Sequence, residues 1–183
     1  MRKTFLFMTY NLLLMTVLAL TGCGYTTRSM VATQYKTIHV APFVNKIDFT
    51  REVETNSSSH IYQPGMEADI TRAVVDRLLF DGNLRPVKVE NADLSLKGEL
   101  VEFRRDPLRY TEGDDVLEYR LNIVVNLSLW DVKENTLKWE ENSFTGETTY
   151  FTSGNLAKPE SLAINDALND LARRVVERIV EQW

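Results

Sequence analysis

Alternation of apolar and polar residues predicts four β-strands, and residues 116–130 show it most clearly. Successive side chains of a strand point to opposite faces of a sheet, so one face of this segment is apolar and the other polar. The apolar positions are Leu117, Tyr119, Leu121, Ile123, Val125, Leu127 and Leu129, and the polar positions are Glu118, Arg120, Asn122, Asn126 and Ser128. This pattern is typical of an antiparallel sheet with one buried and one solvated face. Further strands are expected at Lys36–Phe43, Ala92–Arg105 and Leu137–Tyr150.

Two other segments place apolar residues at helical spacing, and each predicts an amphipathic helix. The first runs from about Met66 to Asp81 and is followed by Gly82, a residue type that often ends a helix in the left-handed conformation. The second runs from about Pro159 to Glu181, and proline suits a first helical turn. Their apolar stripes are Met66, Ile70, Val74 and Leu78 in the first, and Ile164, Leu168, Leu171, Val175 and Ile179 in the second.

The order strand, helix, strand, strand, strand, helix predicts an α+β two-layer sandwich. We expect two helices packed on one face of a mostly antiparallel four-stranded sheet. A short extended piece is expected at Arg85–Val89, a turn at Asp106–Asp115, and a hairpin at Asp131–Thr136. Because two helices cover only one face, the other face of the sheet has to meet water or a polar partner.

The first 22 residues have the composition of a secretory signal peptide. Arg2 and Lys3 supply positive charge, residues 5–20 contain no charged side chain, and the small residues Thr21 and Gly22 follow. Directly after them stands Cys23. This arrangement resembles the lipobox of bacterial lipoproteins, in which the cysteine becomes acylated after cleavage. An uncleaved membrane span and an ordinary buried thiol are the alternatives.

The N-terminal pattern therefore divides the chain into three parts. We expect a signal peptide at 1–22, a lipidated tether at 23–35 and one domain at 36–183. Several acyl chains on one cysteine make membrane attachment effectively permanent. Gly24 stands where an aspartate signals inner-membrane retention in enteric lipoproteins, so we expect an outer-membrane protein on the periplasmic side.

The composition argues against several classes of function. The formal net charge is −5 and no basic stripe is visible, which speaks against nucleic-acid binding. His39 and His60 lie far apart, with no cysteine or acidic cluster at ligand spacing, so we expect no metal. The chain has no glycine-rich phosphate loop and no GxSxG motif, and no nucleophile stands with a base. We therefore expect no catalytic residues and no cofactor, and the chain is not expected to be an enzyme.

Basic residues near the strand ends are candidates for binding an anionic lipid. Arg104, Arg105 and Arg109 flank one hairpin, Lys133 and Lys138 flank the next, and Lys158 precedes the last helix. Basic side chains gathered at one end of a sheet can hold phosphate groups. The alternative is that they keep hairpin tips soluble and prevent unwanted strand pairing.

Aromatic residues near the last two strands allow a second kind of contact. Trp130 and Trp139 are expected to face each other across a hairpin, where cross-strand packing is the ordinary interpretation. A protein interface is the alternative, because tryptophan is enriched at such surfaces.

Taken together, these segments resemble the LptE family, the lipoproteins that assemble lipopolysaccharide in the outer membrane. The resemblance covers nearly the whole chain and depends on the combination of lipobox, order of elements and individual segments. Those segments are Leu20–Tyr25, Ile38–Asn45, Pro64–Thr71, Ala92–Phe103, Glu118–Asp131, Trp139–Phe151 and Ala167–Trp183.

The resemblance implies a partner, a ligand and two binding residues. Members of the family sit as a plug inside the LptD β-barrel, whose polar lumen suits the polar face of the predicted sheet. They also bind lipopolysaccharide through basic residues. One of these falls in an Ala-Lys pair before the last helix, which Ala157 and Lys158 match. The other lies in the loop before the Glu-Tyr strand, where the aligned place is not basic here and Arg109 is the nearest candidate.

Two other functions remain open on the sequence alone. Residues 38–103 also look like the N-terminal half of curli-secretion-type lipoproteins, and another structural lipoprotein of the cell envelope is equally compatible. A secretion pore needs additional amphipathic hairpins, and this chain has only one long strand of that kind. A periplasmic enzyme would need a cleft with clustered polar groups.

Overall fold

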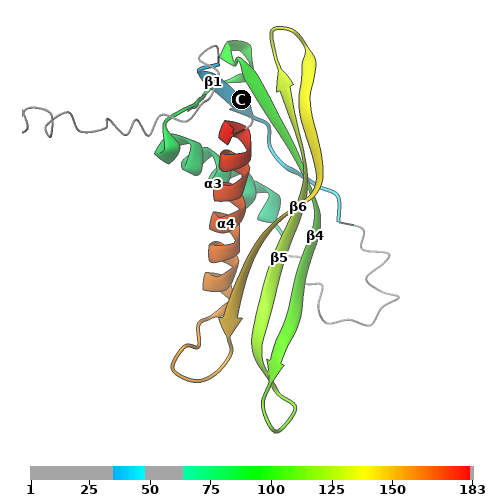
Figure 1. The fold of residues 1–183 in the computed structure, drawn as a ribbon, viewed down its shortest axis with the longest axis vertical. Coiled ribbons are helices and arrows are strands. Elements are labelled where there is room, and N and C mark those ends of the chain that lie inside the picture. Colours follow the sequence, from blue (N-terminus) through cyan, green and yellow to red (C-terminus); the bar gives the residue numbers. More distant parts are fainter. Residues whose placement is uncertain (1–34, 48–63, 182–183) are drawn as a thin grey trace, which may run out of the picture.

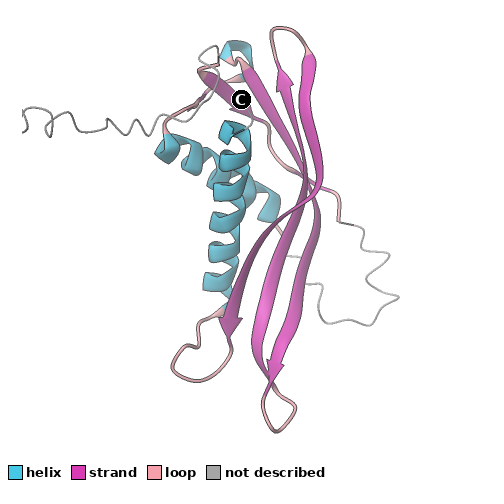
Figure 2. Ribbon diagram, in the orientation of Figure 1, coloured by secondary structure: helices cyan, strands magenta, loops and turns pink. Residues whose placement is uncertain are grey.

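A mixed six-stranded sheet forms one layer of the structure, and two helices form the other (Figures 1 and 2). The computed structural model describes residues 35–47 and 64–181. The expected signal peptide, Cys23 and nearly all of the tether lie outside the described residues, as does most of the long polar stretch before the first helix. The α+β class and the two helices on one side of the sheet agree with the sequence patterns.

Three long antiparallel strands, β4 (Leu94–Tyr110), β5 (Val116–Asp131) and β6 (Thr136–Phe151), make up most of the sheet. At about 3.3 Å per residue, each extends over roughly 50 Å. β4 continues five residues beyond its expected end, through the segment predicted as a turn. Pro107 fits there because, among the described residues, only β5 pairs with β4 beyond Leu100. The missing N–H of a proline is tolerated where a strand lies at a sheet edge.

The expected sheet of four mostly antiparallel strands is wrong in the number of strands, and its short strands pair in parallel, whereas the three long strands are antiparallel. The predicted first strand, Lys36–Phe43, is the shorter β1 (Thr37–Val40), and an unexpected strand, β2 (Val44–Asn45), follows it; both pair with β4 in parallel. The short piece β3 (Arg85–Pro86) pairs in parallel with β1. The parallel pairs exist because a helix carries the chain back to the end of the sheet where β1 starts, as in any crossover connection.

The first helix, α3 (Met66–Asp81), has the predicted bounds and buries the predicted stripe of four apolar side chains. It ends at Gly82, whose φ is 77° and whose N–H donates to the Leu78 oxygen at 3.0 Å. Left-handed glycine is the usual way to satisfy a free helix carbonyl. The chain then passes through β3 and a short 3-10 helix, η1 (Val89–Asn91), before β4 begins.

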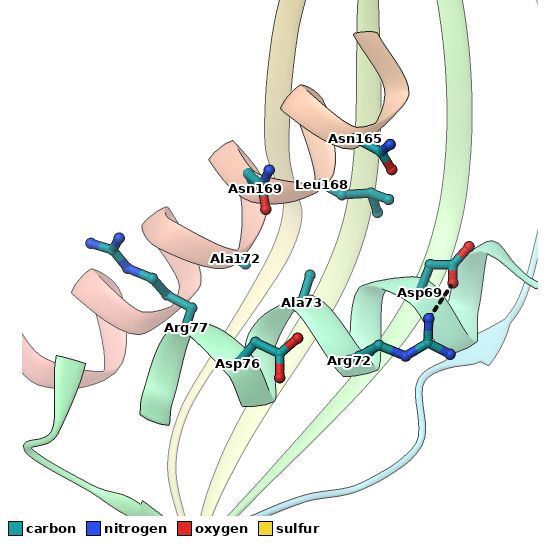
Figure 3. A pocket seen from close by; sticks show the side chains of 9 residues that line it. All are labelled: Asp69, Arg72, Ala73, Asp76, Arg77, Asn165, Leu168, Asn169 and Ala172. Carbon is teal, nitrogen blue, oxygen red and sulfur yellow. Dashed lines mark hydrogen bonds and ion pairs between the residues drawn. The ribbon is translucent and has the colours of Figure 1, made fainter. Parts of the chain in front are cut away.

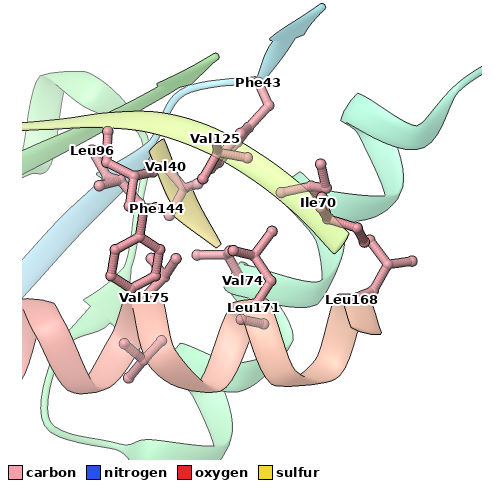
Figure 4. Packing of buried hydrophobic residues seen from close by; sticks show 14 of the residues in the cluster. Val40, Phe43, Ile70, Val74, Leu96, Val125, Phe144, Leu168, Leu171 and Val175 are labelled. Carbon is pink, nitrogen blue, oxygen red and sulfur yellow. The ribbon is translucent and has the colours of Figure 1, made fainter. Parts of the chain in front are cut away.

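The last helix, α4 (Glu160–Glu181), packs along β6 and against α3. Figure 4 shows Leu171 and Val175 of this helix in the same core as Val74 of α3 and Phe144 of β6. The helix backbone comes so close to β6 that a Cβ on Gly146 would overlap the Cα and Cβ of Leu171. A residue without a side chain is therefore required at this contact.

The sheet has two ends that differ in what they hold. The proximal end contains β1, β3 and the 132–135 turn between β5 and β6. The distal end contains the 111–115 turn between β4 and β5, together with the 152–159 loop that leads into α4. These two names are used below.

Candidate functional site

The sheet face turned away from the helices, called the outer face here, is polar along all three long strands. The register places these side chains in rows across the strands, for example Lys97, Ser128 and Glu140. Its polar members are Lys97, Glu99, Glu102, Arg104, Asp106, Arg120, Asn122, Asn126, Ser128, Glu140, Glu147 and Thr149. The predicted alternation of β5 is thus confirmed by burial, because its apolar positions from Leu121 to Leu129 are at most 1% exposed.

The two tryptophans expected to face each other lie on opposite faces of the sheet. Trp139 pairs with Leu129 on the inner face, while Trp130 pairs with Leu137 on the outer face. The irregularity between these two pairs separates them. On the outer face, the Trp130 indole N–H donates to Ser128 Oγ at 3.2 Å, and the Lys97 ammonium lies 5.0 Å from the ring centroid.

A β-bulge deforms the outer face near its middle. Ser143 adopts a left-handed φ of 59°, and its N–H donates to Asn126 Oδ1 at 3.0 Å. Bulges bend a strand and redirect its side chains. A shallow polar hollow of about 200 Å³ lies close by. Its lining is Lys97, Glu99, Asn126, Leu127, Ser128, Glu140 and Asn142.

The distal end brings the two predicted lipopolysaccharide contacts, Arg109 and Lys158, to the same aromatic residue. The Arg109 guanidinium lies 6.0 Å from the centre of the Phe151 ring. The Lys158 N–H donates to the Phe151 oxygen at 3.1 Å, next to an isolated bridge between Phe151 and Ala157. Residues 49 positions apart in the chain therefore share one end of the sheet. Their ligand stays a prediction.

Each of these two cations is paired with a carboxylate. Arg109 Nε lies 2.9 Å from Glu118 Oε2, and the Glu118 side chain is only 10% exposed. Lys158 Nζ lies 2.5 Å from Asp166 Oδ2, almost two turns into α4. An incoming phosphate at either cation therefore has to compete with a carboxylate already in place.

The distal end is also apolar in part. Four large apolar side chains near the two cations are between 39% and 73% exposed, namely Leu108, Tyr110, Leu156 and Leu162. They come from the last residues of β4, the 152–159 loop and the start of α4. Cations beside exposed apolar groups match the two halves of an anionic amphiphile.

The two neighbouring arginines of β4 do not join this surface as free cations. Arg105 points to the inner face, where its guanidinium lies 2.8 Å from Glu160 and 4.7 Å from the Tyr119 ring. Burial, followed by the charge of Glu160, raises the pKa of the Tyr150 hydroxyl at this inner corner. Arg104 lies on the outer face between Glu102 and Asp106, at 2.9 and 2.8 Å.

Lys133 and Lys138 lie at the proximal end, so the basic residues of the two hairpins do not gather at one end. Successive turns of an antiparallel meander necessarily fall at opposite ends of the sheet. Lys133 Nζ contacts Asp93 at 2.6 Å, and Lys138 Nζ contacts Asp131 at 3.4 Å. The Tyr35 hydroxyl donates to Asp131 at 2.8 Å, which ties the start of the domain to this turn.

Hydrogen bonds lower the pKa of both aspartates in this proximal cluster. For Asp93, the ammonium of Lys133 contributes most, followed by the backbone N–H of Lys36. For Asp131, burial acts in the opposite direction, but hydrogen bonds from the Glu134 N–H, the Tyr35 hydroxyl and the Lys138 ammonium outweigh it. The cluster therefore holds ionised carboxylates and stabilises the fold. The alternation patterns of the strands did not indicate this cluster, because its members come from four separate segments of the chain.

A polar groove of about 640 Å³ lies between the two helices (Figure 3). Charged side chains of α3 face asparagines of α4 across it, and Arg72 contacts Asp69 at 3.4 Å. Its lining contains no serine, cysteine or histidine, so it offers no nucleophile with a base. The lining residues are Asp69, Arg72, Ala73, Asp76, Arg77, Asn165, Leu168, Asn169 and Ala172.

Neither described helix has an apolar stretch that is long enough to span a bilayer. No group of three or more histidine, cysteine, aspartate or glutamate side chains at metal-binding distance occurs within 35–47 and 64–181.

Comparison with known proteins identifies a family and a set of related folds. A family model described as LptE, lipopolysaccharide-assembly, matches residues 35–183. A crystal structure of a Xanthomonas campestris protein is 13% identical, covers 80% of this chain and 85% of its own, and has a TM-score of 0.52. This likeness supports the fold alone.

Two lipoprotein structures are also similar. A minor lipoprotein from Acinetobacter baumannii is 17% identical, with 80% of this chain and 93% of that chain covered and a TM-score of 0.48. The rare lipoprotein B from Shewanella oneidensis is 14% identical, with 78% and 91% covered and a TM-score of 0.42. No curated protein matches the chain.

Proposed function

Because this chain belongs to the LptE family of lipopolysaccharide-assembly proteins, we propose that it plugs an LptD-like β-barrel of the outer membrane and helps to assemble it. The observation that carries this proposal is the polar outer face. Three strands of 16 or 17 residues present charged and amide side chains that neither helix covers. The lumen of an outer-membrane barrel is polar, so it is a suitable environment for such a face.

We further propose that the distal end contacts lipopolysaccharide during export. Arg109 and Lys158 would bind phosphate groups, and the exposed Leu156 and Leu162 beside them would contact the acyl part. A guanidinium or ammonium makes short, charge-assisted hydrogen bonds to phosphate. Because Asp166 already neutralises Lys158, binding is an exchange of one anion for another and is therefore readily reversible. Reversible binding suits a protein that passes its ligand on.

Attachment to the membrane is the third part of the proposal. After removal of residues 1–22, acylated Cys23 would hold the domain to the periplasmic leaflet of the outer membrane through a tether at 23–35. Membership of a lipoprotein family and the lipobox pattern support it.

Co-purification from detergent-solubilised outer membrane tests the barrel partner. The full lipidated chain is expected to bring down one large β-barrel in about equal amounts. Recovery of the lipidated chain free of any barrel would contradict the proposal. A large symmetric ring in electron micrographs would favour a secretion-pore lipoprotein instead.

Lipopolysaccharide binding is tested by charge changes at the distal end. Lys158→Glu is expected to weaken binding of purified lipopolysaccharide at least about tenfold, because losing a charged hydrogen bond costs more than 1.4 kcal/mol. Asp166→Asn is expected to strengthen binding, since it removes the competing carboxylate. Lys88→Glu, an exposed lysine near the proximal end, is the matched control. Equal affinity of all four proteins would remove the assignment of Lys158.

A further inference from the structure

Two large apolar side chains at the C-terminal end of α3 are exposed to solvent. Phe80 keeps 81% of its surface exposed and Leu79 60%, whereas Leu78 beside them is fully buried. The last turn of α3 projects away from the sheet beyond α4 (Figure 1). The Arg77 guanidinium lies 5.3 Å from the centre of the Phe80 ring.

This apolar pair lies at the proximal end, close to the point where the chain leaves the domain toward Cys23. The Arg85 N–H donates to the Lys36 oxygen at 2.9 Å. Arg85 follows Phe80 by five positions, and even a fully extended chain of that length spans at most about 18 Å. Phe80 is therefore held near Lys36, the second residue of the domain that the structure describes.

We propose that Leu79 and Phe80 dock into the surface of the phospholipid bilayer that holds acylated Cys23. The inference rests on the lipid anchor proposed above. Lys36 follows Cys23 by thirteen positions, a distance of at most about 45 Å. A surface tethered at that range has an effective concentration of about a millimolar at the bilayer. A weak apolar contact is therefore enough to dock it there.

The side chains around the pair suit the headgroup region rather than the bilayer core. Arg77 lies along the Phe80 ring and can direct its guanidinium to lipid phosphates, as arginine does at membrane surfaces. Asp76, one helical turn before Phe80, is exposed and has to stay in water. Only the last turn of α3 therefore enters the interface. Docking there also fixes the orientation of the domain, because the distal end lies roughly 50 Å away along the strands.

A single fluorescent label tests the docking. Cys23 is the only cysteine and is acylated under the proposed anchor, so Phe80→Cys adds a unique free thiol. The full lipidated chain carrying an environment-sensitive dye at this thiol is reconstituted into vesicles of phosphatidylethanolamine and phosphatidylglycerol that contain a headgroup-level spin label. The control is Glu112→Cys, an exposed position in the 111–115 turn at the distal end.

The expected result is several-fold stronger quenching and a blue-shifted emission at position 80 compared with position 112. Adding Leu79→Ser to the Phe80→Cys chain is expected to reduce the quenching. Equal quenching at the two positions, or a blue shift at position 80 without any quenching by lipid, would overturn the docking and point to a protein contact. Reaction of the unsubstituted chain with the dye would instead refute the anchor at Cys23.

Discussion

The two faces of one sheet follow the same strands but do different things. On the inner face of β5, Leu121 and Ile123 are fully buried under the helices. Arg120, which directly precedes Leu121 in the same strand, is exposed on the outer face. The period of two in a strand places neighbours in the chain on opposite faces. The alternate residues on the inner face thus stabilise the fold, and the residues between them are available to contact a partner.

The two faces also differ in how closely the backbone approaches its neighbours. Gly98 and Gly146 both lie on the inner face, and a Cβ on either would overlap a packed neighbour, Phe43 in one case and Leu171 in the other. The outer face has no such constraint among the described strands. Substitutions on the inner face should therefore change stability, and substitutions on the outer face should change association.

The largest effect is expected from Leu129→Ala, compared with Ser128→Ala beside it. Leu129 is fully buried, so its truncation should lower the free energy of unfolding by about 3 kcal/mol through lost burial and an internal cavity. Ser128→Ala should change it by less than about 0.5 kcal/mol. Urea unfolding measures both. Similar losses of unfolding free energy in the two variants would contradict this difference between the two faces.

The next largest effect is expected from Gly146→Ala. The added Cβ pushes α4 away from β6, because the obstructing atoms include backbone atoms of Leu171, at a cost of about 2 kcal/mol. Thr149→Ala on the outer face of the same strand is the control, with an expected change below about 0.5 kcal/mol. If thermal unfolding showed Gly146→Ala to be as stable as the original chain, the close contact of α4 with β6 would be wrong.

A smaller, pH-dependent effect is expected from Asp93→Asn at the proximal end. The folded pKa of Asp93 lies well below its ordinary value of 3.8, mainly because of Lys133. Its contribution is therefore present above about pH 4 and is lost as the pH falls toward the folded pKa. Asp93→Asn should cost about 1–2 kcal/mol at pH 7, and less at pH 2. A difference that stays constant between pH 7 and pH 2 would contradict this assignment.

The smallest effect on stability is expected from Glu147→Gln on the outer face. Its nearest cation, Arg120, lies 4.0 Å away, and both side chains are about half exposed. Exposed pairs of this kind contribute less than about 0.5 kcal/mol. Circular dichroism in urea should show an unchanged midpoint, while co-purification with the barrel should fall if this position lies in the interface. A clear loss of stability would show that the outer face also supports the fold.

The parts of the fold that a local period defines were predictable from the sequence. The alternation in β5 and the stripe of α3 gave both elements with nearly correct bounds, because burial of one face imposes that period. The two-residue strands β2 and β3 were not recognised as strands of the sheet, because two residues cannot show a period. Their parallel pairing depends on where α3 returns the chain.

The two candidate residues, Lys158 and Arg109, could be named from the sequence and stay predictions as ligand contacts, whereas their ion pairs could not be foreseen. Lys158 and Arg109 follow from a family motif and from the position of a hairpin. Their carboxylate partners, Glu118 and Asp166, depend on a strand register with bulges and on how the 152–159 loop turns into α4. Likewise, the sequence could not show that Lys133 lies at the opposite end, beside an aspartate 40 residues earlier.

Site-specific photo-crosslinking in living cells tests the central claim most directly. A photoreactive residue is placed at Glu140 or Thr149 on the outer face, and at Asn165 or Asn169 in the groove between the helices. All four side chains are at the surface of the domain. Strong crosslinks to a large β-barrel are expected from the two outer-face positions, and weak crosslinks are expected from the two helix positions. Crosslinks from the helix positions alone would show that the partner covers the helical layer, and the outer face would then have no part in the plug.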